Sequence, residues 1–184
     1  LYQKVWQVLN FHLTLQNACF IKEVKMKIYA IDNLPKNKIV EFFELHWGST
    51  QMVVSSGVYD CSELDGFAVL NEEDEIIGLI TYIIKDDECE IISLDSIEEG
   101  KGIGTTLIKE VENLAIKKRC RRVKLITTND NLLALKFYQK RGFVLSKIFN
   151  NAVEKARKIK PQIPLIGNDG IPIRDEIELI KHLD

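Results

Sequence analysis

The order of apolar and polar residues predicts mostly β-strands in the first half of the chain. Apolar residues gather there in short runs bounded by polar turn residues, as in strands joined by hairpins. These runs span residues 26–31, 66–70, 76–84 and 89–94. One helical stripe, with apolar residues at spacings of three and one, follows Pro35 and is predicted to end at Gly48. The stretch between Gly48 and Asp65 follows neither period and is predicted to be irregular.

The second half of the chain alternates helical and strand patterns. An apolar stripe after Gly104 predicts an amphipathic helix, and a second helix is predicted from the N-cap candidate Asn131 to Gly142. Further strands are predicted at 123–127, 143–149 and 174–183, with a basic helical stretch at 151–160 and an irregular, proline-containing connection after it. This order predicts one α+β (or α/β) domain built on a mixed sheet.

Composition agrees with a single folded domain. The chain has 184 residues, of which 46% are hydrophobic and 28% charged, with only four prolines and ten glycines. These values exclude a disordered or collagen-like protein and suit one domain with a full core. Residues 1–25 hold scattered apolar residues among Gln and Asn, so we interpret them as an N-terminal extension or a cloning remnant. The domain itself is predicted to span residues 26–184.

Cysteine, histidine and hydropathy patterns exclude several other classes. The four cysteines contain no CxxC pair and the three histidines stand alone, so neither a disulfide scaffold nor a metal site is predicted. No apolar run reaches the roughly 18 residues of a membrane span, and the first residues lack the features of a secretory signal. We therefore expect a cytoplasmic protein without a membrane partner.

Charge is distributed unevenly, although the formal net charge is only −2. Residues 60–99 contain fourteen acids and one lysine, a net charge of −13, which we call the acidic block. Residues 101–160 contain sixteen bases and four acids, a net charge of +12. The reversal predicts two surfaces, one for an anionic ligand and one for a cationic ligand, unless surface charges merely cluster. Nucleic acid is not expected, because the basic run at 117–122 contains no aromatic residue.

The glycine-rich segment Gly100-Lys101-Gly102-Ile103-Gly104 stands between a predicted strand and a predicted helix. Glycines let a ligand approach the backbone, and a helix start offers unpaired N–H groups, so this segment suits a pyrophosphate. A tight structural turn is the alternative. The segment does not match GxxxxGK[ST], and as a GxGxxG loop its third glycine comes one residue early.

Two segments in register resemble the motifs of one family. The first, Arg-Gly-x-Gly-Ile-Gly, is matched by Gly100, Gly102, Ile103 and Gly104. The second, Asn-x-x-Ala-x-x-x-Tyr-x-x-x-Gly-Phe, is matched by Asn131, Ala134, Tyr138, Gly142 and Phe143. The chain thus resembles the GNAT superfamily of acyl-CoA-dependent N-acetyltransferases, in detail over residues 89–143 and in element order over about 26–183.

The resemblance implies a mixed sheet flanked by helices, with splayed strands at an acetyl-CoA site. It implies Tyr138 as the acid that protonates the leaving thiolate and Glu90 as a general base, with a solvated strand carboxylate as the alternative for Glu90. The implied cofactor-binding residues are Leu94, Asp95, Ser96, Glu99, Gly100, Lys101, Gly102, Ile103, Gly104, Thr105, Asn131 and Tyr138. Glu99 stands where the family has Arg or Gln.

The function that follows is acetyl transfer from acetyl-CoA to a primary amine of a small molecule or peptide, by direct attack without an acyl-enzyme. A CoA-binding regulatory or sensor module without turnover is the alternative. The acidic block favours a cationic acceptor, and Lys101, Lys136 and Lys140 are candidates for binding the CoA phosphates. We expect a monomer or a homodimer.

Overall fold

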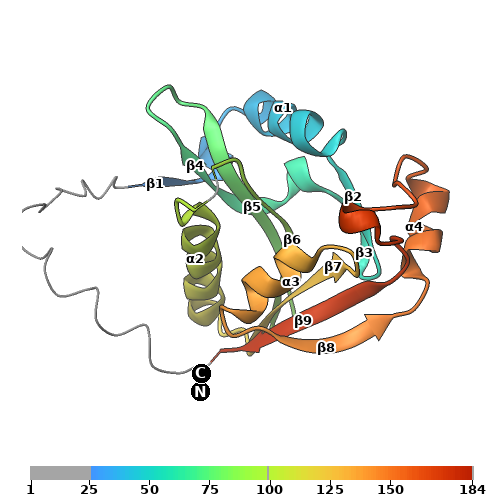
Figure 1. The fold of residues 1–184 in the computed structure, drawn as a ribbon. Helices are drawn as coiled ribbons and strands as arrows, with labels where there is room; N and C mark the ends of the chain where they lie inside the picture. Colours follow the sequence, from blue (N-terminus) through green and yellow to red (C-terminus); the bar gives the residue numbers. More distant parts are fainter. Residues whose placement is uncertain (1–25, 99, 184) are drawn as a thin grey trace, which may run out of the picture.

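The computed structural model describes residues 26–98 and 100–183 (Figure 1). The first half forms β1 (Lys27–Ala30), α1 (Lys36–Trp47), β2 (Gln51–Val54), β3 (Gly57–Asp60), β4 (Asp65–Leu70), β5 (Ile76–Lys85) and β6 (Glu88–Ser96). The second half forms α2 (Ile103–Lys117), β7 (Arg122–Thr128), α3 (Leu132–Gln139), β8 (Val144–Phe149), α4 (Ala152–Ile159) and β9 (Glu176–His182). Among these elements, no helix is long and apolar enough to cross a membrane.

Seven strands form one mixed sheet in the order β1-β4-β5-β6-β7-β9-β8. β6 and β7 run parallel, and the other neighbouring strands run antiparallel. Helix α2 connects the parallel pair, as a crossover connection must. The predicted α+β fold on a mixed sheet is thus confirmed.

Helices cover both faces of the sheet (Figure 1). On one face, the apolar stripe of α2 packs into a core that includes Leu107 and Val111, both with no exposed surface. On the other face, α1 places Phe42 and Phe43 over Leu79 of β5. Because both faces are buried, the central strand β5 is apolar along most of its length, and residues 89–93 of β6 are all buried.

The parallel strands β6 and β7 separate halfway along their length. Their pairing runs from Glu88 opposite Arg122 to Ile91 opposite Leu125, and no pair follows in the described residues. A bulge lies at this point, because Ser93 pairs with β5 but Ile92 has no partner there. A bulge bends its strand, and the two strands diverge into a V, which confirms the predicted splayed strands.

The prediction of an irregular segment between residues 49 and 65 is wrong in part. β2 and β3 pair there as a separate hairpin with Ser55 and Ser56 at its turn. Each strand has four residues and neither is fully buried. The alternation of apolar and polar residues is therefore too short to be recognised in the sequence. The basic stretch 151–160, in contrast, forms α4 as predicted.

The predicted domain boundary leads to a test by truncation. Residues 1–25 lie outside the described residues, and the sheet begins with Lys27 of β1, paired to Leu70 of β4. We expect a protein that starts at Met26 to melt within about 2 °C of the full chain, which corresponds to about 0.5 kcal/mol for a domain of this size. Calorimetry on both forms measures this difference. A larger drop in Tm would show that residues 1–25 belong to the domain.

Candidate active site

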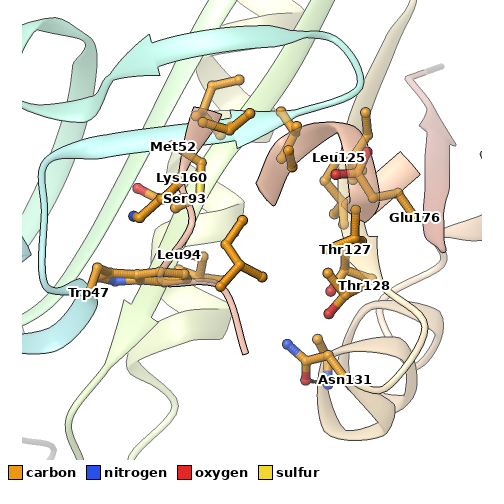
Figure 2. A pocket seen from close by; sticks show the side chains of 18 of the residues that line it. Trp47, Met52, Ser93, Leu94, Leu125, Thr127, Thr128, Asn131, Lys160 and Glu176 are labelled. Carbon is orange, nitrogen blue, oxygen red and sulfur yellow. Dashed lines mark hydrogen bonds between the residues drawn. The ribbon is translucent and has the colours of Figure 1, made fainter. Parts of the chain in front are cut away.

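A cavity of about 380 Å³ lies where β6 and β7 diverge, and we call it the inner cavity (Figure 2). Its floor comes from residues 91–94 of β6 and 125–128 of β7. The β2 segment 52–54, helix α4 and the connection after it form further walls. Two segments outside the seven-stranded sheet therefore wall the space between the splayed strands and make it a pocket.

A second cavity, of about 560 Å³, lies along the glycine-rich segment, and we call it the glycine-loop cavity. The start of α2 forms one of its walls and α3 forms another. Leu94, Ala134 and Tyr138 line both this cavity and the inner cavity. The two spaces therefore meet at these three residues, which we call the junction.

The glycine-rich segment has the geometry of an anion-binding loop. Gly100 and Gly102 have φ values of +73° and +80°, which strain any residue with a side chain. A Cβ at either position would meet no atom within 4 Å, so the space beside them is open. Gly102 caps α2 without a side-chain hydrogen bond, which leaves the first N–H groups of the helix available to a ligand.

Tyr138 lies on α3 at the junction. Its ring packs edge-on against Phe137 and Phe143, at centroid distances of 5.2 and 5.5 Å, and 7% of the residue is exposed. Burial raises the pKa of the phenol well above its usual value, and the nearby charge of Arg141 opposes this rise. The hydroxyl therefore stays protonated at neutral pH, as a proton donor must.

Arg141 is a cation of the glycine-loop cavity that sequence reasoning missed. Its Nε donates to Oγ1 of Thr105 at 3.1 Å, and its Nη1 donates to the carbonyl of Phe137 at 2.6 Å. The guanidinium also lies 3.5 Å from the centre of the Phe137 ring. Its place between Tyr138 and Gly142 of the second matched motif, just past the end of α3, could have indicated it. The predicted phosphate ligands Lys101, Lys136 and Lys140 do not line the cavity.

Most of the other predicted cofactor residues gather at this cavity. Its lining includes Leu94, Ser96, Gly100, Gly102, Ile103, Gly104, Thr105 and Tyr138. Asn131 lines the inner cavity instead and caps α3, because its Oδ1 accepts from the N–H of Ala134 at 3.0 Å. Asp95 lines neither cavity, and its Oδ1 accepts from the N–H of Ser96 at 2.9 Å. Glu99 lies outside the described residues.

Glu90 is buried in the sheet but lines neither cavity. Its Oε1 accepts a hydrogen bond from the Ser56 hydroxyl at the turn of the β2–β3 hairpin, and its Oε2 lies 3.5 Å from Nζ of Lys124. Burial by itself would lower the pKa of Lys124, but Glu88 and Glu90 together raise it. The contacts of Glu90 therefore hold the hairpin turn and a neighbouring strand.

Two charged residues of the inner cavity, Lys160 and Glu176, were not among the sequence candidates. Lys160 follows α4 and is 9% exposed, and its Nζ donates to the carbonyl of Gln51 at 2.8 Å. Glu176 begins β9 and is 3% exposed, and its Oε2 accepts from the N–H of Ser55 at 2.7 Å. Figure 2 shows Lys160 on the side of Met52 and Glu176 on the opposite side of the cavity.

Comparisons with known proteins agree with this arrangement. The profile of the Acetyltransferase (GNAT) family matches residues 36–143. The uncharacterized protein YxbD of Bacillus subtilis (strain 168) is 55% identical over 158 residues, which cover 86% of this chain and 99% of that protein.

Two solved structures share the fold. The IAA acetyltransferase from Bacillus cereus ATCC 14579 is 21% identical with a TM-score of 0.64, over 86% of this chain and 99% of that one. A GNAT family acetyltransferase from Elizabethkingia anophelis with acetyl-CoA bound is 21% identical with a TM-score of 0.62, over 86% and 98%. The match of the family profile to more than half of the chain is decisive: the chain belongs to the GNAT family of acetyltransferases.

Proposed function

We propose that the protein transfers the acetyl group of acetyl-CoA to a primary amine by direct attack. The junction of the two cavities carries this proposal. A cofactor that enters along the glycine-rich segment and an acceptor held in the inner cavity would meet at Leu94, Ala134 and Tyr138. Such a meeting point holds thioester and amine together, which a purely regulatory CoA site does not require.

The glycine-loop cavity suits the phosphate end of acetyl-CoA. The open backbone at Gly100 and Gly102 and the free start of α2 provide N–H donors for a pyrophosphate. Arg141 adds a cation that Thr105 and the Phe137 ring hold in place. The Elizabethkingia anophelis neighbour, whose structure contains acetyl-CoA, supports the same choice of cofactor.

The proposed chemistry uses two side chains. The amine nitrogen bonds to the carbonyl carbon of the thioester, and the carbon–sulfur bond then breaks toward a thiolate. Tyr138 donates its phenolic proton to that sulfur. Glu176 lines the inner cavity and Glu90 does not, so we assign contact with the amine to Glu176 and support of the hairpin turn to Glu90.

The buried cysteines support two parts of the proposal, direct attack by the amine and a cytoplasmic location. Cys61, Cys89 and Cys120 are free and buried, and burial raises the pKa of each thiol. Protonated thiols are poor nucleophiles, which supports direct attack over an acyl-cysteine intermediate. Unpaired cysteines are usual in a reducing cytoplasm.

Replacing Arg141 with Gln should weaken acetyl-CoA binding about tenfold to a hundredfold, because a charged hydrogen bond to phosphate contributes about 1.5–3 kcal/mol. The kcat at saturating acetyl-CoA should stay close to that of the wild type, since the guanidinium is assigned to the phosphates. Calorimetric titration measures the Kd, and Lys140→Gln is the control because Lys140 does not line the cavity. Equal acetyl-CoA affinity in the two variants would contradict this role.

A screen of primary amines tests the proposed function. Free thiol release from acetyl-CoA is followed for each amine, and mass spectrometry then identifies the acetylated product. We expect at least one amine to give thiol and N-acetyl product in equal amounts. Tight acetyl-CoA binding without a product from any amine would instead favour the CoA-binding module.

A further inference from the structure

Two buried charges of opposite sign face the inner cavity without a charged partner. Lys160 and Glu176 line it from different sides, and no opposite charge lies within 4.0 Å of either among residues 26–98 and 100–183. Buried charges in proteins are normally paired, because desolvation of a lone ion is costly. Both side chains are therefore placed to be neutralised by a ligand.

Each of the two groups retains free hydrogen-bonding capacity toward the cavity. The Lys160 ammonium has three N–H donors and gives one to the carbonyl of Gln51. The Glu176 carboxylate accepts from the N–H of Ser55 through Oε2, which leaves Oε1 for a ligand. Burial lowers the pKa of Lys160, and a bound anion would reverse that effect.

The rest of the cavity wall is mostly apolar, which favours a ligand with an apolar group beside its two charges. Its apolar lining includes Trp47, Met52, Val54, Ile92, Leu125 and Ile163. The lining contains no carboxylate of the acidic block among the described residues. A volume of about 380 Å³ is at the small end for ligand pockets, which range over about 300–1,000 Å³. It suits a single small molecule better than a peptide.

We propose that the acceptor is a free amino acid with an apolar side chain, bound by its carboxylate at Lys160 and by its amine at Glu176. This inference rests on the proposed function and names its substrate class. One such molecule would offer an anion to Lys160, a cation to Glu176 and an apolar side chain to the cavity wall. A polyamine would satisfy Glu176 but would place a further positive charge in the cavity of Lys160.

The reaction balances with these groups. The bound ammonium gives one proton to Glu176, and the free amine attacks the thioester carbon. As the carbon–sulfur bond breaks, Tyr138 protonates the sulfur, and the second proton of the attacking nitrogen restores the phenol. The products are the N-acetyl amino acid, CoA as the thiol, and one proton that Glu176 releases to solvent.

Pairs of matched acceptors test the proposal. Apolar amino acids such as leucine, methionine and phenylalanine are each compared with their amides, which keep the amine and side chain but lack the carboxylate. We expect kcat/KM for the acids to exceed that for the amides by about tenfold to a hundredfold, the usual effect of a charged hydrogen bond. Spermidine represents the polyamine acceptors in the same assay.

Variants then assign this preference to Lys160. In Lys160→Met, kcat/KM for the acid divided by kcat/KM for the amide should fall close to one. Lys160→Arg should restore part of the preference for the acid. A merely structural role would lower both rates together and leave the ratio unchanged. Lys158→Met is the matched control, because Lys158 is an exposed lysine of α4, two residues before Lys160.

The outcomes separate this inference from the proposed function. Acetylation of amides or spermidine in preference to apolar amino acids would overturn the inference and keep the acetyltransferase. An unchanged ratio in Lys160→Met would overturn the assignment of the carboxylate to Lys160. Failure of every amine to give product would overturn both.

Discussion

Tyr138→Phe should lower kcat by about 10²- to 10⁴-fold, the usual contribution of a positioned proton donor. The substitution removes one hydroxyl and keeps the ring between Phe137 and Phe143, so packing is retained. Acetyl-CoA affinity should change little, because the proton is needed only as the carbon–sulfur bond breaks. Steady-state kinetics with the best amine, together with calorimetric titration of acetyl-CoA, measure both quantities.

Tyr82→Phe is the matched control for this loss. Tyr82 is also 7% exposed, and burial raises the pKa of its phenol to about 12, but it lines neither the inner cavity nor the glycine-loop cavity. We expect this control to keep kcat near the wild-type value. Wild-type kcat in Tyr138→Phe would show that water or another group protonates the thiolate. An equal loss of acetyl-CoA affinity would make Tyr138 a binding residue.

Gly102→Asp should raise the Kd for acetyl-CoA about a hundredfold or more. The φ of +80° at Gly102 strains any side chain, and the new carboxylate would stand in the open space that we assign to the pyrophosphate. Like charges in close contact cost several kcal/mol, and about 2.7 kcal/mol corresponds to a hundredfold change in Kd. Isothermal titration of wild type and variant with acetyl-CoA measures the effect.

The backbone strain of this variant needs its own control. Gly170 has a φ of +71° and open space around its Cβ position, but it lines neither of the two cavities. Gly170→Asp therefore carries similar strain and the same new charge away from the proposed cofactor site. We expect both variants to lose similar stability and only Gly102→Asp to lose acetyl-CoA affinity. Unchanged affinity in Gly102→Asp would place the pyrophosphate elsewhere.

Short motifs made it predictable from sequence that the glycine-rich segment and Tyr138 lie together. The glycines require a particular backbone, and their distance from Tyr138 along the chain reflects the regular lengths of helix α2, strand β7 and two turns of α3. Gly102, Gly104 and Tyr138 line one cavity, and their contact with the cofactor stays a prediction. Arg141 was missed because an arginine at a helix end is usually a solvated residue.

The acceptor side depends on contacts that are distant in sequence. Lys160 contacts Gln51 over 109 positions, and Glu176 contacts Ser55 over 121. Sequence patterns show neither burial nor such distant contacts, so both residues look like ordinary surface charges. The net charge of the acidic block suggested a cationic acceptor. Among the described residues, however, none of the carboxylates of this block lines the inner cavity.

A crystal structure with acetyl-CoA bound tests the central claim most directly. We expect the pyrophosphate against the backbone at Gly100 and Gly102, with pantetheine leading to Leu94 and Ala134. The thioester sulfur should lie within hydrogen-bonding reach of the Tyr138 hydroxyl, about 3–3.5 Å, with its carbonyl carbon facing the inner cavity. A thioester that points away from the junction, or lies farther than one water molecule from Tyr138, would contradict it.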